Sequence, residues 1–148
     1  MSTMAQNPAF VAYALSTVVL MLNLSLLWAM SGGVRGKTKT ALNPEDVVSV
    51  AKGAALVQAD PPEVARVLRA HQNALVNIVP FAFLGLLFVL VNGPAREAQI
   101  LFGAFTFFRV GHSISYLAGK QPWRSLTFAL GGLTTLLLMV EVVRYLLA

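Results

Sequence analysis

Four long apolar stretches, separated by shorter polar connections, dominate the pattern of the 148-residue chain. At a rise of 1.5 Å per helical residue, about 20 apolar residues cross the roughly 30 Å hydrocarbon core of a bilayer. Each stretch is long enough for this. The pattern predicts an all-α protein, a four-helix transmembrane bundle with spans at about residues 8–30, 62–91, 98–118 and 125–147.

The connections predict how these helices follow one another. The short turn Asn92-Gly93-Pro94 makes the second and third spans antiparallel neighbours. The longer first connection contains Asn43-Pro44-Glu45-Asp46, whose N-cap, proline and early acids predict a short helix outside the membrane. Asp60-Pro61-Pro62-Glu63 repeats this signal and predicts that the second helix begins in the interface before its span. The spans leave no room for another domain, so we expect residues 1–148 to form a single domain.

The charges predict the orientation of the bundle. The net charge is +5, and only 11% of the residues are charged. Because cationic loops stay inside, we expect the first and third connections to be cytoplasmic and both termini to lie on the opposite side. The alanine-rich composition and short loops favour a bacterial inner membrane. No basic face outside the bilayer offers nucleic-acid binding. Eight of the eleven Lys and Arg residues lie in or beside those two connections: Arg35, Lys37, Lys39, Lys52, Arg66, Arg69, Lys120 and Arg124.

The chain contains no cysteine, which excludes disulfides, thiolate metal sites and a protein thiol nucleophile. We expect no metal site, and any sulfur chemistry must come from a ligand. The first ten residues lack Lys and Arg, and the first apolar stretch is longer than the core of a typical signal peptide. We therefore expect the first span to stay in the protein.

A polar stripe in the second half of the third span indicates a site. Arg109, His112, Ser113 and Tyr116 fall within an arc of roughly 100° on the predicted helix. An arginine inside a membrane is costly and usually faces protein or a wet cavity. His112 could equally be a structural histidine.

The second helix carries another stripe, Arg66, Arg69, Asn73 and Asn77, with spacings of three, four and four residues. The two arginines could contact lipid headgroups at the interface, and the two amides could join helices. A ligand contact is the alternative for all four.

Arg124-Ser125 is predicted at the start of the fourth helix. Free backbone N–H groups and the positive end of the helix dipole favour an anion there, and a nearby thiol would ionise more readily. Ser125 could instead be only an N-cap. Three helices thus send hydrogen-bond donors toward the cytoplasmic side of one bundle.

The order and spacing of these motifs resemble the MAPEG family, the membrane-associated proteins in eicosanoid and glutathione metabolism. The resemblance covers about three quarters of the chain. The motifs that carry it are Val34-Arg35, Asn43-Pro44-Glu45-Asp46, Arg66-x-x-Arg69-Ala70-His71-x-Asn73, Pro80-Phe81, Arg109-Val110-x-His112-x-x-x-Tyr116-Leu117-x-Gly119-Lys120 and Arg124-Ser125.

The resemblance implies a homotrimer of four-helix subunits that binds glutathione between neighbouring subunits. It implies that Arg124 and Ser125 hold or activate the thiol, with Asp46 as a hydrogen-bond partner or proton relay. It further implies a set of residues that contact glutathione or support its pocket: Arg35, Arg69, Gln72, Asn73, Arg109, His112 and Tyr116.

The chain departs from the family pattern at several of these places. Ala65 and Val76 occupy positions where the family commonly has glutamate, so the carboxylate that would balance Arg69 is absent. Gln72 stands where a similar relative has arginine. Phe128 and Ala129 replace a tyrosine and a threonine near the thiol end.

Three functions follow as hypotheses. The first is a glutathione-dependent membrane enzyme, a transferase, peroxidase or isomerase, acting on a lipophilic electrophile or peroxide. The second is a divergent, non-catalytic family member that binds a lipid or a partner membrane protein. The third is a proton-linked transporter subunit using His112 and Glu141. It is the weakest, because Glu141 lies near the other end of the bundle and is expected to pair with Arg144.

Overall fold

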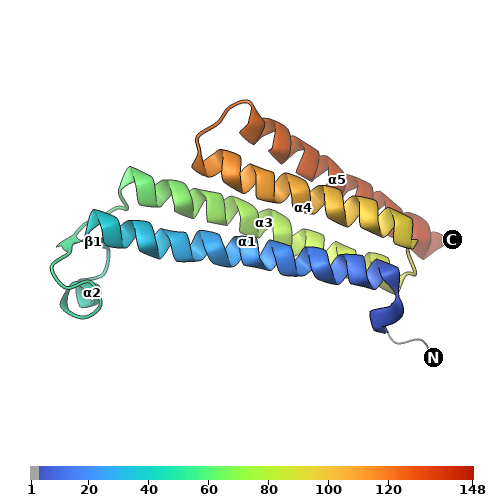
Figure 1. Cartoon of the computed structure of the whole chain (residues 1–148), viewed down its shortest axis with the longest axis horizontal. Helices are drawn as coiled ribbons and strands as arrows, with labels where there is room; N and C mark the ends of the chain where they lie inside the picture. The colour runs from blue at the N-terminus through green and yellow to red at the C-terminus, as the bar shows by residue number, and fades with distance from the viewer. Residues whose placement is uncertain (1–3) are drawn as a thin grey trace.

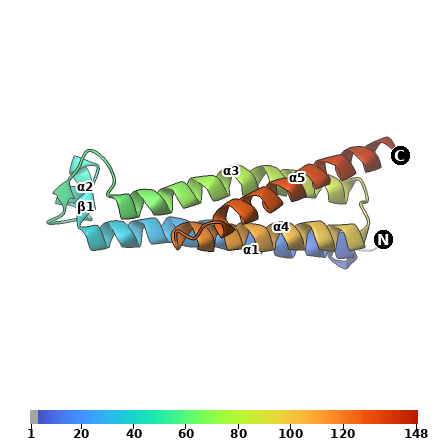
Figure 2. The ribbon, with the colours of Figure 1, turned by 90° about the horizontal axis from the view of Figure 1, so that it is seen from above.

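The computed structural model describes residues 4–148 and shows long helices packed lengthwise against one another (Figures 1 and 2). Four of the helices are long and apolar enough to cross a membrane, which confirms the predicted four-helix membrane bundle. In chain order the elements are η1 (Met4–Gln6), α1 (Pro8–Thr38), β1 (Thr40–Ala41), α2 (Pro44–Val48), β2 (Ala55–Leu56), α3 (Pro62–Leu90), α4 (Ala95–Leu117) and α5 (Trp123–Leu147).

Helix α1 is longer than its predicted span. It begins where the Asn7 side chain accepts a hydrogen bond of 2.9 Å from the Ala9 backbone N–H. We expected it to end near Met30, but it continues to Thr38. The glycines between residues 32 and 36 do not stop it, because each costs a helix only about 1 kcal/mol relative to alanine. The left-handed conformation of Lys39, with φ of 50°, ends the helix.

The first connection contains the predicted short helix α2, but its N-cap differs from the prediction. Asn43 holds the N-cap position, and its side chain makes no capping bond. Its amide instead donates to the Asp46 carboxylate at 3.1 Å. Strands β1 and β2 pair in parallel, with Thr40 opposite Ala55. Two-residue strands carry no periodic signal, which is why the sequence did not predict them.

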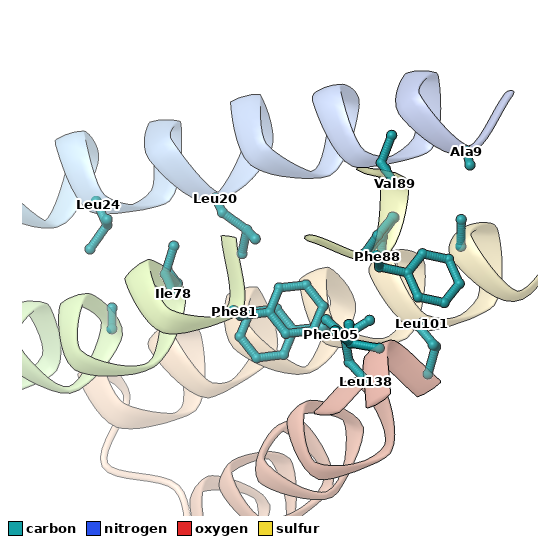
Figure 3. Packing of buried hydrophobic residues seen from close by; sticks show 14 of the residues in the cluster. Ala9, Leu20, Leu24, Ile78, Phe81, Phe88, Val89, Leu101, Phe105 and Leu138 are labelled. Carbon is teal, nitrogen blue, oxygen red and sulfur yellow. The ribbon is translucent and has the colours of Figure 1, made fainter. Parts of the chain in front are cut away.

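The core lies where the four long helices meet (Figure 3). Phe81 of α3 stacks on Phe105 of α4 with ring centroids 3.5 Å apart. Leu20 of α1, Ile78 of α3 and Leu138 of α5 are fully buried in the same cluster. Because lipid tails are as apolar as these side chains, close packing rather than water exclusion favours this arrangement in a membrane.

The two ends of the bundle differ in content. In both views, α2 and the α4–α5 turn lie toward one end, and the C-terminus lies at the other (Figures 1 and 2). The C-terminal end holds the predicted pair of Glu141 and Arg144, whose Nε donates to the carboxylate at 2.6 Å. Arg144 also reaches Glu97 of α4 at 3.2 Å, and Tyr145 donates to Glu97 at 2.9 Å. The other end carries the candidate site.

Candidate functional site

A hollow of about 300 Å³ lies between α3 and α4. Arg69, Gln72, Asn73 and Val76 of α3 line it together with Tyr116 of α4. Four residues predicted to contact a ligand therefore share one hollow. The spacing along α3 explains this, because residues three, four and seven apart lie on one helix face.

The lining of this hollow is donor-rich and carries no acid. The Arg69 side chain is exposed, and Asn73 is half-buried with its Oδ1 atom buried and without a hydrogen-bond partner. Its neighbour on the face, Val76, is 55% exposed. The hollow thus offers a guanidinium, amide groups and a phenol, which suits an anionic ligand that also has an N–H group to give.

Arg124 contacts Tyr116, one of the residues that line the hollow. Its guanidinium carbon is 5.0 Å from the centroid of the Tyr116 ring, a cation–π contact. The His112 ring lies edge-on to Tyr116 with centroids 5.7 Å apart, and its Nδ1 is 2.9 Å from the Arg124 carbonyl oxygen. A carbonyl only accepts, so Nδ1 carries the proton. In the neutral ring Nε2 is then an acceptor, and it is buried without a partner.

The start of α5 excludes the alternative that Ser125 is an N-cap. The helix begins at Trp123, two residues earlier than expected, and Pro122 holds the N-cap position. Ser125 therefore lies within the first turn and is not an N-cap. Its exposed hydroxyl donates to the Gln121 side chain at 3.1 Å. It does not line the hollow between α3 and α4.

Arg35 and Asp46 lie in a different place from the other predicted residues. They line a larger hollow of about 670 Å³, formed by the end of α1 and the connection that follows it. Arg35 forms a salt bridge of 2.7 Å with Asp60, a partner that sequence analysis treated only as part of a helix-start signal. The two hollows share no lining residue. A single chain thus carries those predicted residues that line a hollow as two separate groups.

Arg109 belongs to neither hollow. Its side chain is only 1% exposed and lies inside the chain, where it donates to a carbonyl of α5.

Glu141 lies at the other end of the bundle, where it is bonded to Arg144. His112 instead contacts Arg124 at the beginning of α5. Nothing in this arrangement favours a transport path that uses both His112 and Glu141.

Arg66 reaches from α3 to the α4–α5 turn. Gly119 in that turn has φ of +67°, and a Cβ atom added to it would lie 2.8 Å from the Arg66 Nη1 atom. We expect Gly119→Ala to destabilise the protein by about 1–3 kcal/mol, because the left-handed backbone at this position opposes a side chain, while the exposed Arg66 guanidinium can move aside. Unfolding in detergent measures this. Gly103→Ala is the control, since a Cβ there meets nothing within 4 Å, and an equal loss in both variants would contradict the interpretation.

Comparisons with known proteins agree with the family resemblance. The profile of the MAPEG family matches residues 13–144. The chain is 33% identical over 133 residues to prostaglandin E synthase of Homo sapiens, covering 89% of this chain and 86% of that protein. It is 36% identical over 135 residues to microsomal glutathione S-transferase 1 of Bos taurus, covering 88% and 86%. The corresponding protein of Rattus norvegicus is 37% identical over 139 residues, covering 92% and 88%.

Proposed function

The chain belongs to the MAPEG family, and from this membership we propose that it is a glutathione-dependent membrane enzyme acting on a lipophilic electrophile or peroxide. Relatives named glutathione S-transferase and prostaglandin E synthase support an enzymatic role. The observation that carries the proposal is the acid-free hollow beside Arg124. The Arg69 guanidinium can bind an anion in the hollow, and the Arg124 guanidinium lies against the ring of Tyr116, which lines the same hollow.

The chemistry of glutathione suits this hollow. Glutathione has two carboxylates, two amide N–H groups and a thiol. In the proposed pose a carboxylate pairs with Arg69, and the side-chain amides of Gln72 and Asn73 lie along the same wall, beside the amide groups of the ligand. Tyr116 lines the hollow together with this anchor and also contacts Arg124. Charge-assisted hydrogen bonds to arginine are the strongest non-covalent contacts that such a ligand can make.

The proposed reaction begins with the glutathione thiolate near Arg124. The guanidinium and the positive end of the α5 dipole favour the charged form of the thiol and so lower its pKa. The thiolate sulfur then attacks carbon of an electrophile, forming a C–S bond while the leaving group departs with the electron pair. With a peroxide it attacks oxygen instead: an S–O bond forms as the O–O bond breaks, the alkoxide leaves with the electron pair and takes up a proton, and a second glutathione converts the resulting sulfenic acid to the disulfide and water.

The two separate hollows support a site shared between subunits. The two hollows share no lining residue, so one glutathione could touch both Arg35 and Arg69 where hollows of neighbouring copies face each other. We propose a homotrimer in which the first connection of one subunit covers the α3–α4 hollow of its neighbour. Asp46 would then reach the thiol end from the partner copy as a hydrogen-bond partner or proton relay.

The charge distribution supports a cytoplasmic site. The cationic first connection and the α4–α5 turn lie toward the same end of the bundle (Figures 1 and 2). Because positively charged loops stay inside, we propose that this end is cytoplasmic, where glutathione is available. The bacterial inner membrane stays a prediction.

Turnover assays test the proposed function directly. The purified protein in lipid nanodiscs is given glutathione with chlorodinitrobenzene, an electrophile, or cumene hydroperoxide, a peroxide. We expect glutathione-dependent turnover of at least one of them. The acid-free hollow also favours a second candidate, a non-catalytic member that binds a lipid or a partner membrane protein. Glutathione binding without turnover of either substrate would favour that candidate.

The missing carboxylate leads to a prediction about ligand choice. Because no acid lines the hollow, the ammonium group of glutathione should contribute little, and N-acetylglutathione should bind nearly as well as glutathione. In a Val76→Glu variant we expect glutathione to outcompete the acetylated form by about two- to fivefold, the value of an exposed ion pair. Competition binding measures both ratios. Strong preference for free glutathione in the unaltered protein would contradict the prediction.

A further inference from the structure

Arg109 occupies a seat formed by two aromatic rings. Its guanidinium carbon lies 5.4 Å from the centroid of the Phe105 ring of α4 and 5.3 Å from that of Phe128 of α5. Its Nη2 atom donates to the Phe128 carbonyl at 3.2 Å. Among the ion pairs of residues 4–148, none includes Arg109. Its Nε and Nη1 atoms are buried without a hydrogen-bond partner in the described residues, so the two rings and the carbonyl offset only part of the cost of burying this cation.

A glycine completes the seat. A Cβ atom added to Gly131 of α5 would lie 2.7 Å from both Nε and Nη2 of Arg109, so the guanidinium fills the place of a side chain. Gly132, the next residue, meets nothing within 4 Å. Gly131 follows Phe128 by three residues and shares its helix face. Phe105, Phe128 and Gly131 together are called the Arg109 seat below.

The same face of α4 continues toward the candidate site. His112 and Tyr116 lie three and seven residues beyond Arg109, and both contact Arg124 of α5. The seat holds α5 one turn after Arg124, at Phe128. Helix α4 therefore contacts the beginning of α5 at successive turns, and Arg109 is the most buried of the α4 residues that make these contacts.

We propose that Arg109 is a positioning residue, which fixes the first turns of α5 on α4 through its seat and so holds Arg124 at Tyr116. The inference rests on the proposed function for what Arg124 does there. Arg109 does not itself contact the ligand, because it is 1% exposed and lines neither hollow. Its effect on the thiol site is indirect: the guanidinium packs against the seat, and the seat fixes the turns of α5 that carry Arg124.

Helix positions can be measured without any ligand. The chain has no cysteine, so Ile114→Cys of α4 and Leu126→Cys of α5, both at exposed positions, allow clean spin labelling. We expect Gly131→Ala to shift or broaden the distance distribution between the two labels, because the new methyl group displaces the guanidinium. Gly132→Ala is the matched control and should leave the distribution as it is in the labelled parent.

The second readout is the pKa of glutathione bound to the protein, followed by the ultraviolet absorbance of the thiolate as pH is varied. In Gly131→Ala we expect this pKa to rise and kcat to fall by about 10- to 100-fold, the usual effect of misplacing a catalytic group by an ångström. The KM for glutathione should change little, since the α3 hollow is intact. If Gly131→Ala does not fold, Phe128→Leu removes one ring of the seat and should shift both readouts in the same direction.

The outcomes separate the two proposals. Label distances in Gly131→Ala and Phe128→Leu that match those of Gly132→Ala would overturn the positioning role. Shifted distances with an unchanged thiol pKa would also overturn it. Shifted distances in a protein that binds no glutathione at all would support the seat as the element that positions α5 and would reject the proposed function instead.

Discussion

Arg124→Ala is expected to lower glutathione-dependent turnover by about 10²- to 10³-fold, the cost of removing one preorganised donor from a developing or bound anion. The backbone should stay in place, because His112 bonds to the Arg124 carbonyl and not to its side chain. The loss should therefore appear in kcat, with a raised pKa of the bound thiol. Initial rates in nanodiscs at several pH values measure both.

Lys120→Ala is the control for this variant. Lys120 is an exposed cation in the same turn, and it lines neither hollow. Its removal changes the local charge by the same amount and should leave the rate unchanged. Equal losses in the two variants would show that net charge near the turn, and not the position of Arg124 on Tyr116, determines the rate.

Arg69→Met is expected to weaken glutathione binding by about 10- to 150-fold, because hydrogen bonds to a charged group contribute about 1.5–3 kcal/mol. Methionine keeps much of the side-chain length and apolar contact, so the loss reports on the guanidinium. At saturating glutathione kcat should be close to that of the unaltered protein. Isothermal titration calorimetry gives the affinity, and the dependence of rate on glutathione concentration gives KM.

Arg96→Met provides the comparison for Arg69→Met. Arg96 is an exposed arginine in the first turn of α4, at the other end of the bundle from the hollow. It should not affect affinity. Unchanged binding in Arg69→Met would exclude the α3–α4 hollow as the place where the carboxylate is held.

Helical periodicity was sufficient to predict the features that lie along a single helix. The four spans and the short helix α2 follow from runs of apolar residues and from N-terminal proline and acid signals. Arg69 and Asn73 of the predicted stripe share one hollow as their spacing indicates, whereas Arg66 and Asn77 of that stripe do not line it. Gln72, which also lines the hollow, was implied only by the family resemblance. Tyr116 joins them because the short α3–α4 turn makes those helices neighbours.

Helical periodicity does not predict which side chains meet between two helices. The stripe on α4 predicted that Arg109 faces protein, but its partners Phe128 and Gly131 depend on how α4 and α5 are aligned lengthwise. The pairing of Arg35 with Asp60 depends in the same way on the course of a loop.

Direct binding of glutathione tests the central claim most simply. Radiolabelled glutathione is equilibrated with the purified full-length protein in nanodiscs, and the bound fraction is measured as a function of concentration, with Arg69→Met in parallel. The account predicts saturable binding to the unaltered protein, binding that is weakened in Arg69→Met, and thiolate absorbance from the bound ligand at neutral pH. Absence of saturable binding to the unaltered protein would contradict it.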